Sequence, residues 1–590
     1  MEALIQKLKL LGEPMEQTRV CFKDFGFRYK EANSWALRNV SLMIEAGEIV
    51  LVLGQSGCGK STLALALNGA VPHLIEGEVE GSLTVVGLST LTTNVLELSH
   101  NVGIVFQDPE IQLFALTVED EVAMSLESYG IPREEMRKRV DWALSVCGLS
   151  GMELKAPAKL SGGQKQLIAI AAVLAREPEI LVFDEPTGNL DPVASVYIYE
   201  TIRRLSNERG HSIVLIDQDL EPIIDKVNKV VLLEEGRIIL EATPHDLMRD
   251  LDFLRRCGVK IPVATEFAHR LEQRGLVNYP YIPIKVSEAI TPTVKTLLQR
   301  SVNKRFIEKH KPIQTSIIKK DPIIKFQGVT YEYETGTRAI EDINLEIYPG
   351  EFVTLIGMNG AGKSTLAHHI MGLLKPTRGT VMIDGQNTQK LTVAQMARTV
   401  GLIFQNPNHQ LFIDTIEGEI AFGPQNLGWS EERISNARNQ ILKDLKLSNM
   451  EKLDPESLST GQKQRVAAAS VLVMEPKILL LDEPTTGQDQ ITLEPLMELV
   501  AKLNRAGMTV IMITHDMDVA LRYASRVVIM ADGRILADGS PQEIFLQENV
   551  LAKARLALPQ LLELTKEMFN SKPIFVSTLD EIEESLSDIL

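Results

Sequence analysis

The chain has 590 residues, of which 44% are hydrophobic and 24% charged, which is typical of a globular protein and not of a disordered or fibrous one. Its 61 basic and 78 acidic residues give a net charge of −17, which on average repels nucleic acid. The longest strongly apolar stretch, 167–175, is about half the ~18–20 residues that a transmembrane helix needs, and no N-terminal segment resembles a secretory signal. The chain has four widely spaced cysteines: Cys21, Cys58, Cys147 and Cys257. We therefore expect no disulfide framework or zinc ribbon, and a reducing cytosol fits this pattern.

An internal repeat dominates the sequence. Four blocks recur in the same order: GQSGCGKST (54–62) and GMNGAGKST (357–365), VFQDPEIQLF (105–114) and IFQNPNHQLF (403–412), LSGGQKQ (160–166) and LSTGQKQ (458–464), and ILVFDEPTGNLD (180–191) and ILLLDEPTTGQD (478–489). The spacing of about 300 residues far exceeds the roughly 20–50 residues of a solenoid repeat, so the chain is predicted to be one large domain present twice.

Each glycine-rich loop lies between an apolar strand pattern, 49–53 or 352–356, and a helix-forming series. This context predicts a Walker A site, because glycines let backbone N–H groups and a helix N-terminus point at phosphate oxygens. The expected nucleotide-binding residues are Gly54, Gln55, Ser56, Gly57, Cys58, Gly59, Lys60, Ser61 and Thr62, and Gly357, Met358, Asn359, Gly360, Ala361, Gly362, Lys363, Ser364 and Thr365. The lysines would reach the β- and γ-phosphates and the serines would ligate Mg²⁺. Two complete copies disfavour the alternative, a tight strand–helix turn with an incidental lysine.

Two further apolar runs each end in an acidic pair, Asp184-Glu185 and Asp482-Glu483. A carboxylate has little structural reason to stand at the end of a buried strand, so Asp184 and Asp482 are expected to hold Mg²⁺ through its water shell. Glu185 and Glu483 are placed to accept a proton from the attacking water, which is worth roughly 10²–10⁴-fold in rate.

With LSGGQ between them, these blocks resemble the nucleotide-binding domains of ABC transporters over nearly all of both halves. The resemblance implies an α/β fold: two P-loop NTPase (RecA-like) ABC ATPase domains, each with an antiparallel β subdomain and a helical subdomain. It also implies two ATP molecules sandwiched in a head-to-tail pair, with the signature of one domain completing the site of the other. The signature residues are Ser161, Gly162, Gly163 and Gln164, and Ser459, Thr460, Gly461 and Gln462.

The same resemblance assigns four more site residues. Gln107 and Gln405 would contact Mg²⁺ and the lytic water, and Tyr29 and Tyr333 would stack on adenine, worth about 1–3 kcal/mol by analogy with base stacking. A plain strand-face aromatic is the alternative for each tyrosine. The D-loop residues would be Asp191 and Asp489.

The two copies differ at two motif positions. His515 is the switch histidine of the second copy, but the first copy carries Gln218 there, and Thr460 replaces the first signature glycine. In a head-to-tail pair both changes fall in site one, which combines Lys60 with the second signature. Glutamine cannot carry the charge of an imidazolium, and threonine adds a Cβ beside phosphate. Site two is therefore expected to carry most turnover, and site one, which keeps Glu185, to be slow.

The segments after the Q-loop glutamines, FQDPEIQLFALTVEDEVA and FQNPNHQLFIDTIEGEIAFGPQNLG, and the extension CGVKIPVATEFAHRLEQRG resemble the ATPases of energy-coupling-factor importers, the cobalt, nickel and vitamin type. The resemblance implies a groove for coupling helices of an integral membrane subunit, beside a second, substrate-binding membrane subunit. The chain would lie peripherally on the cytoplasmic side of the cell membrane and would not bind nucleic acid. Nothing in the sequence indicates the solute.

Two alternatives are weaker. A soluble twin-cassette ATPase acting on ribosomes or nucleic acid is supported by the basic segment 295–320, but the net charge opposes it. The ATPase pair of a sugar importer would lack the pattern after the Q-loop.

The predicted organisation has six parts: an N-terminal segment (1–18), ATPase domain 1 (19–250), its C-terminal extension (251–294), a basic linker (295–320), ATPase domain 2 (321–548) and its C-terminal extension (549–590). Thr578 and Glu581 form a capping box before a helix with Leu579, Ile582, Leu586 and Ile589 at helical spacing. The sequence leaves two interpretations of this helix open: a surface helix that covers its own domain, or a docking helix.

Overall fold

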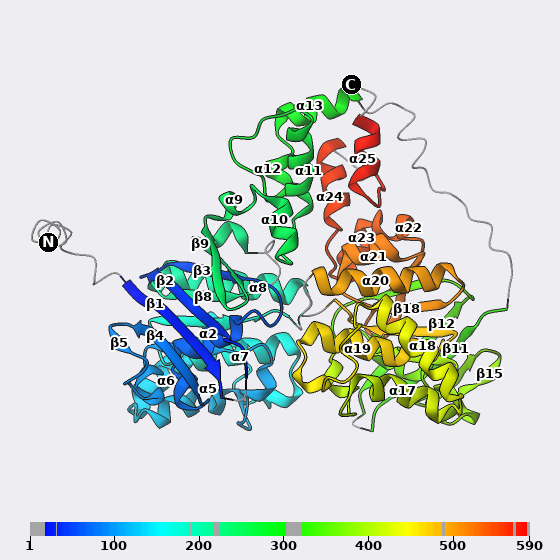
Figure 1. The fold of residues 1–590 in the computed structure, drawn as a ribbon, viewed down its shortest axis with the longest axis horizontal. Coiled ribbons are helices and arrows are strands. Elements are labelled where there is room, and N and C mark those ends of the chain that lie inside the picture. The colour runs from blue at the N-terminus through cyan, green and yellow to red at the C-terminus, as the bar shows by residue number, and fades with distance from the viewer. Residues whose placement is uncertain are drawn as a thin grey trace, which may run out of the picture. The chain divides into compact units, whose positions relative to one another are not determined.

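The computed structural model describes residues 18–586, apart from 31, 189, 191, 218–222, 302–320, 335, 486–489 and 570–573. Gln218, Asp191, Asp489, the segment 1–17 and most of the predicted linker therefore lie outside the described residues. The chain separates into two compact units, which are described one by one (Figure 1). Unit 1 comprises Met1–Leu190 with Ala194–Lys260, and unit 2 comprises Asp191–Val193 with Ile261–Leu590.

The centre of unit 1 is a six-stranded sheet in the order β10-β9-β3-β8-β7-β6. Its strands are β3 (Ile49–Leu53), β6 (Val102–Val105), β7 (Ile180–Asp184), β8 (Ser212–Ile216), β9 (Lys229–Glu234) and β10 (Arg237–Ala242). All neighbours run parallel except β10, which pairs antiparallel with β9. Every residue of β3 and β8 is buried, as expected for parallel strands covered on both faces.

A second sheet and a helical region complete unit 1. The antiparallel sheet has the order β2-β1-β4-β5, with β1 (Thr18–Tyr29), β2 (Leu37–Glu45), β4 (Gly77–Val85) and β5 (Leu88–Ser89). The helices are α2 (Lys60–Leu67), α3 (Ala70–His73), α4 (Val95–Leu98), α5 (Val118–Ser128), α6 (Arg133–Val146), α7 (Gly162–Leu174), α8 (Pro192–Arg209), α9 (Pro244–Leu247) and α10 (Leu251–Arg256). One hydrophobic core joins the two sheets, since Phe22 and Leu42 pack in the same cluster as Val50 and Val182.

Unit 2 repeats this plan. Its sheets have the orders β16-β17-β18-β13-β19-β20 and β12-β11-β14-β15. The strands are β11 (Ile324–Glu332), β12 (Arg338–Ile347), β13 (Phe352–Ile356), β14 (Arg378–Ile383), β15 (Gln386–Asn387), β16 (Val400–Ile403), β17 (Ile478–Asp482), β18 (Thr509–Ile513), β19 (Arg526–Ala531) and β20 (Arg534–Gly539). The helices include α15 (Lys363–Ile370), α16 (Val393–Met396), α17 (Ile416–Asn426), α18 (Glu431–Asp444), α19 (Thr460–Leu472), α20 (Gln490–Arg505), α21 (Met517–Tyr523), α22 (Pro541–Phe545) and α23 (Glu548–Lys553). Both units thus confirm the predicted α/β fold with its antiparallel and helical subdomains.

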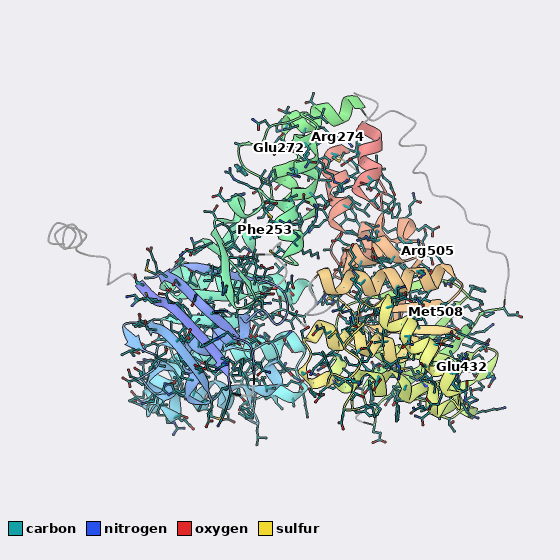
Figure 2. The ribbon with its side chains drawn as sticks, viewed as in Figure 1. Phe253, Glu272, Arg274, Glu432, Arg505 and Met508 are labelled. Carbon is teal, nitrogen blue, oxygen red and sulfur yellow. The ribbon has the colours of Figure 1, made fainter. Side chains whose placement is uncertain are left out.

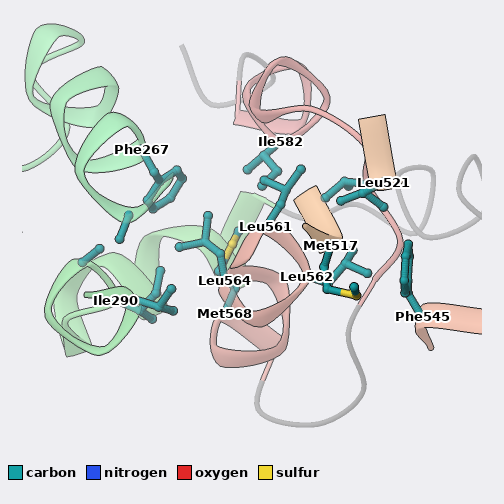
Figure 3. Close-up of a cluster of buried hydrophobic side chains, with 14 of the residues drawn as sticks. Phe267, Ile290, Met517, Leu521, Phe545, Leu561, Leu562, Leu564, Met568 and Ile582 are labelled. Carbon is teal, nitrogen blue, oxygen red and sulfur yellow. The ribbon is translucent and has the colours of Figure 1, made fainter. Parts of the chain in front are cut away.

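The extensions of the two copies fold together inside unit 2. They form α11 (Val263–Gln273), α12 (Val286–Ala289) and α13 (Pro292–Ser301) from the first copy, and α24 (Gln560–Phe569) and α25 (Leu579–Leu586) from the second. Figure 3 shows their shared core, in which Phe267 and Ile290 from the first extension lie with Leu562, Leu564 and Met568 from the second. From Ile261 onward, the extension of the first copy is therefore built into the second unit.

Ion pairs join the two extensions at their surface. The Arg270 guanidinium lies 2.6 Å from Asp580 Oδ1 and 2.9 Å from Glu583 Oε1, and Arg274, labelled at the end of α11 in Figure 2, also pairs with Glu583. Ile582 of α25 is buried in the shared core. The terminal helix therefore packs on the extension of the first copy, within a core that also includes α24 of its own copy.

A truncation in this core tests its contribution to unit 2. Leu562 is fully buried, so Leu562→Ala is expected to lower the free energy of unfolding by about 2–5 kcal/mol through lost burial and a residual cavity. The measurement is the urea midpoint of unit 2 by circular dichroism. Leu373→Ala removes a half-exposed leucine of the same unit and serves as the matched control, with an expected change within about 0.5 kcal/mol. Equal midpoints for the two variants would contradict the packing role.

Candidate ATP site

The phosphate loop of unit 1 adopts the conformation that its glycines predict. Gly59 has φ +109°, and a Cβ there would lie 2.3 Å from the Ala36 carbonyl oxygen, so no other residue fits. Helix α2 begins at Lys60, immediately after Gly59, and the N–H groups of its first turn lie at the loop. Lys60 is buried, and its Nζ donates to Gly54 O (2.8 Å) and Gln55 O (3.0 Å). Two backbone carbonyl oxygens of the loop thus hold the lysine ammonium in place.

The loop of unit 2 has the same construction. Gly362 has φ +99°, and a Cβ on Gly357 would lie 2.3 Å from Met530 O. Lys363 Nζ donates to Gly357 O (2.7 Å) and Met358 O (3.1 Å). Both predicted phosphate loops therefore exist as strand–loop–helix turns after β3 and β13.

The two predicted adenine-stacking tyrosines lie beside these loops. Tyr29 ends β1, and its hydroxyl lies 2.9 Å from Thr62 Oγ1. Tyr333 follows β11, and its hydroxyl lies 3.2 Å from Thr365 Oγ1, with 38% of the residue exposed. Each ring is held next to the first turn of its own phosphate-loop helix and keeps part of its surface open to solvent, as a stacking role requires.

The acidic residues of unit 1 collect at the end of β7. Burial raises the pKa of Asp184, while a hydrogen bond from Ser61 and the charge of Lys60 oppose the rise. Glu185 follows with φ +46°, and Gln107 Nε2 donates to its Oε2 at 2.8 Å. The structure thus brings together Ser61, Gln107 and Asp184, which were predicted separately, and oxygen donors of this kind are the ligands that Mg²⁺ prefers.

In unit 2 the corresponding glutamate, Glu483, has a different neighbour. His515 Nδ1 lies 2.5 Å from Glu483 Oε2. Burial lowers the pKa of His515, but the hydrogen bond and charge of Glu483, with the charge of Asp516, raise it above its ordinary value. Burial and the charge of Glu483 raise the pKa of Asp482 to about 6. The second site therefore pairs its glutamate with a group that can hold a proton.

A residue that sequence reasoning missed lies in unit 1. The backbone N–H of Glu185 binds Ile216 O, and that of Glu483 binds Ile513 O, so the residues after β8 and β18 correspond: Asp217 to Thr514. Aligning IDQD with ITHD would have shown this second change, next to Gln218, without a structure.

Asp217 belongs to a buried hydrogen-bonded network. The hydroxyl of Tyr199 donates to Asp217 Oδ2 at 2.5 Å and lies 2.8 Å from Thr187 Oγ1, in the turn after Glu185. Tyr199 is 1% exposed and Asp217 7%. In unit 2 the hydroxyls of Thr485 and Thr514 lie 3.4 Å apart instead. Unit 1 therefore carries an additional buried carboxylate beside the turn that follows Glu185.

Both signature sequences start helices, as predicted. Ser161 caps α7: its Oγ accepts from Gln164 N (3.4 Å), while Gln164 Oε1 accepts from Ser161 N (3.2 Å). Ser459 and Gln462 make the same reciprocal bonds at the start of α19. The serine hydroxyl protons remain available to donate. Gly162 and Gly163 lie in the first turn of α7, as Thr460 and Gly461 do in α19.

A buried histidine behind the second phosphate loop makes unit 2 sensitive to acid. His369 is fully buried on α15, its Nδ1 bonds Thr365 O at 2.7 Å and its Nε2 has no hydrogen-bond partner. Burial, opposed by that hydrogen bond, lowers the pKa of His369 below its ordinary value. As the pH falls, the unfolded chain therefore takes up a proton on His369 before the folded chain does. The stabilising contribution of the neutral histidine is present above pH ~6.5 and is lost as the pH falls toward the pKa of His369 in the folded chain.

His369→Leu keeps a side chain of similar size without a titrating group. Between pH 7.5 and 5.5 the wild type is expected to lose more stability than His369→Leu, by at most about 1.4 kcal/mol per pH unit. Urea midpoints of unit 2 at both pH values measure the difference, and parallel pH profiles would contradict the prediction. The raised pKa of His515 affects the pH dependence of stability with the opposite sign. His515 is present in both chains, so its contribution cancels when the variant is compared with the wild type.

Within the described residues no group of three or more His, Cys, Asp and Glu side chains could hold a metal ion. In the same part of the chain no helix has the length and hydrophobicity to cross a membrane.

A family model described as ABC transporter matches residues 37–188 and 340–486, which contain both phosphate loops, both Q-loop glutamines, both signature sequences and both acidic pairs. The chain belongs to the ABC transporter family. A protein of Caldanaerobacter subterraneus subsp. tengcongensis named as an ABC transporter ATP-binding protein is 38% identical, over 94% of this chain and 97% of the relative. A relative with the same kind of name from Methanosarcina acetivorans is 38% identical, over 93% of this chain and 90% of its own length. Each unit is thus an ABC ATPase domain, and the chain is an ATPase.

CbiO1 from Clostridium perfringens, titled as part of the ABC transporter complex CbiONQ, is 36% identical, with a TM-score of 0.37, and the match covers 41% of this chain and 97% of that chain.

Proposed function

We propose that the chain is the energy-coupling ATPase of a membrane importer of the energy-coupling-factor type, which takes up a vitamin, a vitamin precursor or a metal ion. Its partners are an integral membrane coupling subunit and a substrate-binding membrane subunit, and it acts peripherally at the cytoplasmic side of the cell membrane. The observation that carries the proposal is a set of exposed apolar side chains directly after each Q-loop glutamine, such as Phe114 (73% exposed) and Phe412 (63% exposed).

Buried carboxylates hold these exposed side chains in place. Glu121 is 3% exposed, and its Oε2 accepts from Phe114 N (2.7 Å) and Ala115 N (2.6 Å). Glu419 binds Phe412 N (3.0 Å) and Ile413 N (2.8 Å) in the same way. Burying an ionisable group is costly unless it is hydrogen-bonded, so a carboxylate used to present apolar residues to solvent supports a docking surface.

The docking segments are tied to the signature helices. Gln166 Nε2 donates to Phe106 O (3.1 Å), and Gln464 Nε2 donates to Phe404 O (3.2 Å), each immediately before a Q-loop glutamine. A displacement of the signature helix is therefore passed through a side-chain amide to the segment that meets the membrane subunit. ATP binding would close the two halves and hydrolysis would reopen them. Nucleotide can drive this movement only because the closed and the open state bind it with different affinity.

We also propose two composite head-to-tail ATP sites. Mg²⁺ would be held by Ser61, Gln107 and Asp184 in site one and by Ser364, Gln405 and Asp482 in site two, where it would supply positive charge to the phosphates. Glu483, with His515 beside it, accepts the proton of the attacking water in site two. In site one Glu185 has the same task, but Asp217 and Gln218 replace the threonine and histidine of the second copy.

The test is affinity purification of the Glu483→Gln chain with ATP from detergent-solubilised membranes of the source cells. The importer predicts enrichment of small hydrophobic membrane proteins, and their loss when Phe114 and Phe412 are both changed to Asp. Ribosomal RNA in place of membrane proteins would support the ribosome or nucleic-acid alternative and overturn the proposal.

A further inference from the structure

A hollow of about 470 Å³ lies in unit 1 at the amino ends of two parallel strands. Gly47 and Asn228, which precede β3 and β9, line it together with Glu200 and Arg203 of α8. The phosphate loop follows the opposite end of β3, and the five residues of this strand separate the two places by roughly 15 Å. The volume falls within the roughly 300–1,000 Å³ of small-molecule pockets, so the hollow is a second candidate ligand site.

Glu200 holds two cations at the hollow. Its Oε1 accepts from Lys226 Nζ at 2.6 Å, and its Oε2 accepts from Arg203 Nε at 3.0 Å. The hydrogen bonds from Lys226 and Arg203 lower the pKa of Glu200, so this carboxylate stays ionised. Lys226 ends the short helix η3 (Ile224–Lys226), and its side chain is only 14% exposed. Both oxygens of Glu200 are therefore used to position positively charged groups.

Hydrogen-bond donors at the hollow remain unused within the part of the chain that the structure describes. There, neither Nη atom of Arg203 makes a hydrogen bond, and Lys226 Nζ makes only the bond to Glu200. Asn228 Oδ1 accepts from the N–H of Ile49 at 2.8 Å, which leaves the amide N–H groups of Asn228 as donors. A guanidinium, an ammonium and an amide thus offer donors at one place.

The second copy lacks the arginine at the corresponding position. Ser206 Oγ donates to the glycine carbonyl before β3 (2.9 Å), and Asn504 Nδ2 makes the equivalent bond before β13 (3.1 Å). Ser206 and Asn504 therefore correspond, and three residues earlier Ala501 stands where α8 has Arg203.

The second copy also lacks the lysine. The backbone N–H groups of Asn228 and Ser525 bind the first residues of β3 and β13, so Tyr523 stands where unit 1 has Lys226. The Tyr523 ring stacks on Phe352, with centroids 6.4 Å apart and planes inclined by 22°. The fold therefore does not require cations at these two positions, and of the two copies only the first carries them.

We propose that the hollow binds a small multivalent anion with two or more carboxylate or phosphate groups. The planar fork of a guanidinium pairs with two oxygens of one such group, and a lysine ammonium adds a point charge. Arg203, Lys226 and Asn228 would hold the anion. Asp225 also lines the hollow, and its charge opposes the anion without removing a donor. This site goes beyond the proposed function, because it lies apart from the phosphate loop and needs no membrane partner.

The experiment measures anion binding to the purified full-length chain by isothermal titration calorimetry without magnesium. One titration uses the tricarboxylate citrate and the other uses inorganic pyrophosphate, so the two arms distinguish a carboxylate from a phosphate ligand. Binding at the phosphate loops is common to all the chains compared, so differences between them report on the hollow.

The variants remove the donors one at a time. Lys226→Gln removes the ammonium, Arg203→Ala introduces the residue of the second copy, and a double variant carries both changes. Arg249→Ala is the matched control. Arg249 pairs with a carboxylate three residues earlier in unit 1, as Arg203 does, but is not among the residues that line the hollow.

The wild type is expected to bind at least one of the two anions. Arg203→Ala and Lys226→Gln are each expected to weaken this binding by about tenfold or more, the size expected for a hydrogen bond between charged groups. Arg249→Ala is expected to bind within about twofold of the wild type. Asp225→Asn removes an opposing charge and is expected to strengthen binding, which tests the same proposal without the loss of a donor. Unchanged melting temperatures show that the variants fold.

Four outcomes would overturn the inference. The first is that the wild type binds neither anion, and the second is that the double variant binds as tightly as the wild type, which would place the anion elsewhere on the chain. An equal loss of affinity in Arg249→Ala would identify a nonspecific effect of charge. Weaker binding by Asp225→Asn would show that this carboxylate contacts a cationic group, and that the ligand is not a simple anion.

Discussion

Glu483→Gln is expected to lower the steady-state ATPase rate by about 100-fold or more, whereas Glu185→Gln is expected to lower it less than about twofold. The reason is that only the second copy pairs its glutamate with a histidine, at 2.5 Å, whose pKa that glutamate raises. Glu185 instead accepts a hydrogen bond from the neutral amide of Gln107. It lies two residues before Thr187, whose hydroxyl contacts the Tyr199 that donates to Asp217. Changing a glutamate to glutamine keeps the size of the side chain but removes the carboxylate that would accept the proton.

The measurement is phosphate release at saturating ATP for the two single variants and the double variant. Nucleotide binding, followed by equilibrium dialysis, is expected to persist in all three, which separates lost chemistry from lost binding. Equal rate losses in the two single variants would refute the asymmetry of the sites, and a double variant slower than Glu483→Gln would measure what site one contributes.

Restoring the second copy's residues in the first is expected to raise activity. In the Glu483→Gln background, Asp217→Thr with Gln218→His is expected to increase the residual ATPase rate by about tenfold or more, since general acid–base groups contribute roughly 10²–10⁴-fold. The double change removes a buried carboxylate beside the turn after Glu185 and supplies a side chain that can hold a proton. It also reproduces the Thr514-His515 pair of site two.

Gln218→His alone is expected to give a smaller gain, because Asp217 stays bonded to Tyr199. Tyr199→Phe, which removes the donor to Asp217, controls for general disturbance of the buried network and should not raise the rate. A double variant no faster than its Glu483→Gln parent would show that Thr460 or another feature limits site one, and would contradict the role given to these two positions.

Much of the site follows from local chemistry. The runs at Ile49–Leu53 and Phe352–Ile356 are strands with the predicted bounds, because a parallel strand covered on both faces needs an unbroken apolar run. The loops are determined by glycines, since a Cβ on Gly59 or Gly357 would meet a carbonyl oxygen. The start of α7 follows from the Ser161–Gln164 capping box, which lies within four residues.

Side-chain hydrogen bonds that join one element to another were not predictable in the same way. Glu121 is one of several acidic residues in VEDEVA, and no local pattern says that it is the buried one holding Phe114 and Ala115. Tyr199 reads as an ordinary helical aromatic until α8 packs over β8 and its hydroxyl meets Asp217.

The sequence by itself determined the duplicated ATPase fold, its phosphate loops and its acidic pairs, because each depends on strand burial, backbone conformation or capping over a few residues. Only the tertiary structure decided that α11–α13 of the first copy fold with α24 and α25 of the second, and which side chain contacts Glu185 and Glu483. The physical reason is that helices such as these expose an apolar stripe that many surfaces could cover, and the choice is made by the complementary shape and charge of one distant surface, as Arg270 and Glu583 show.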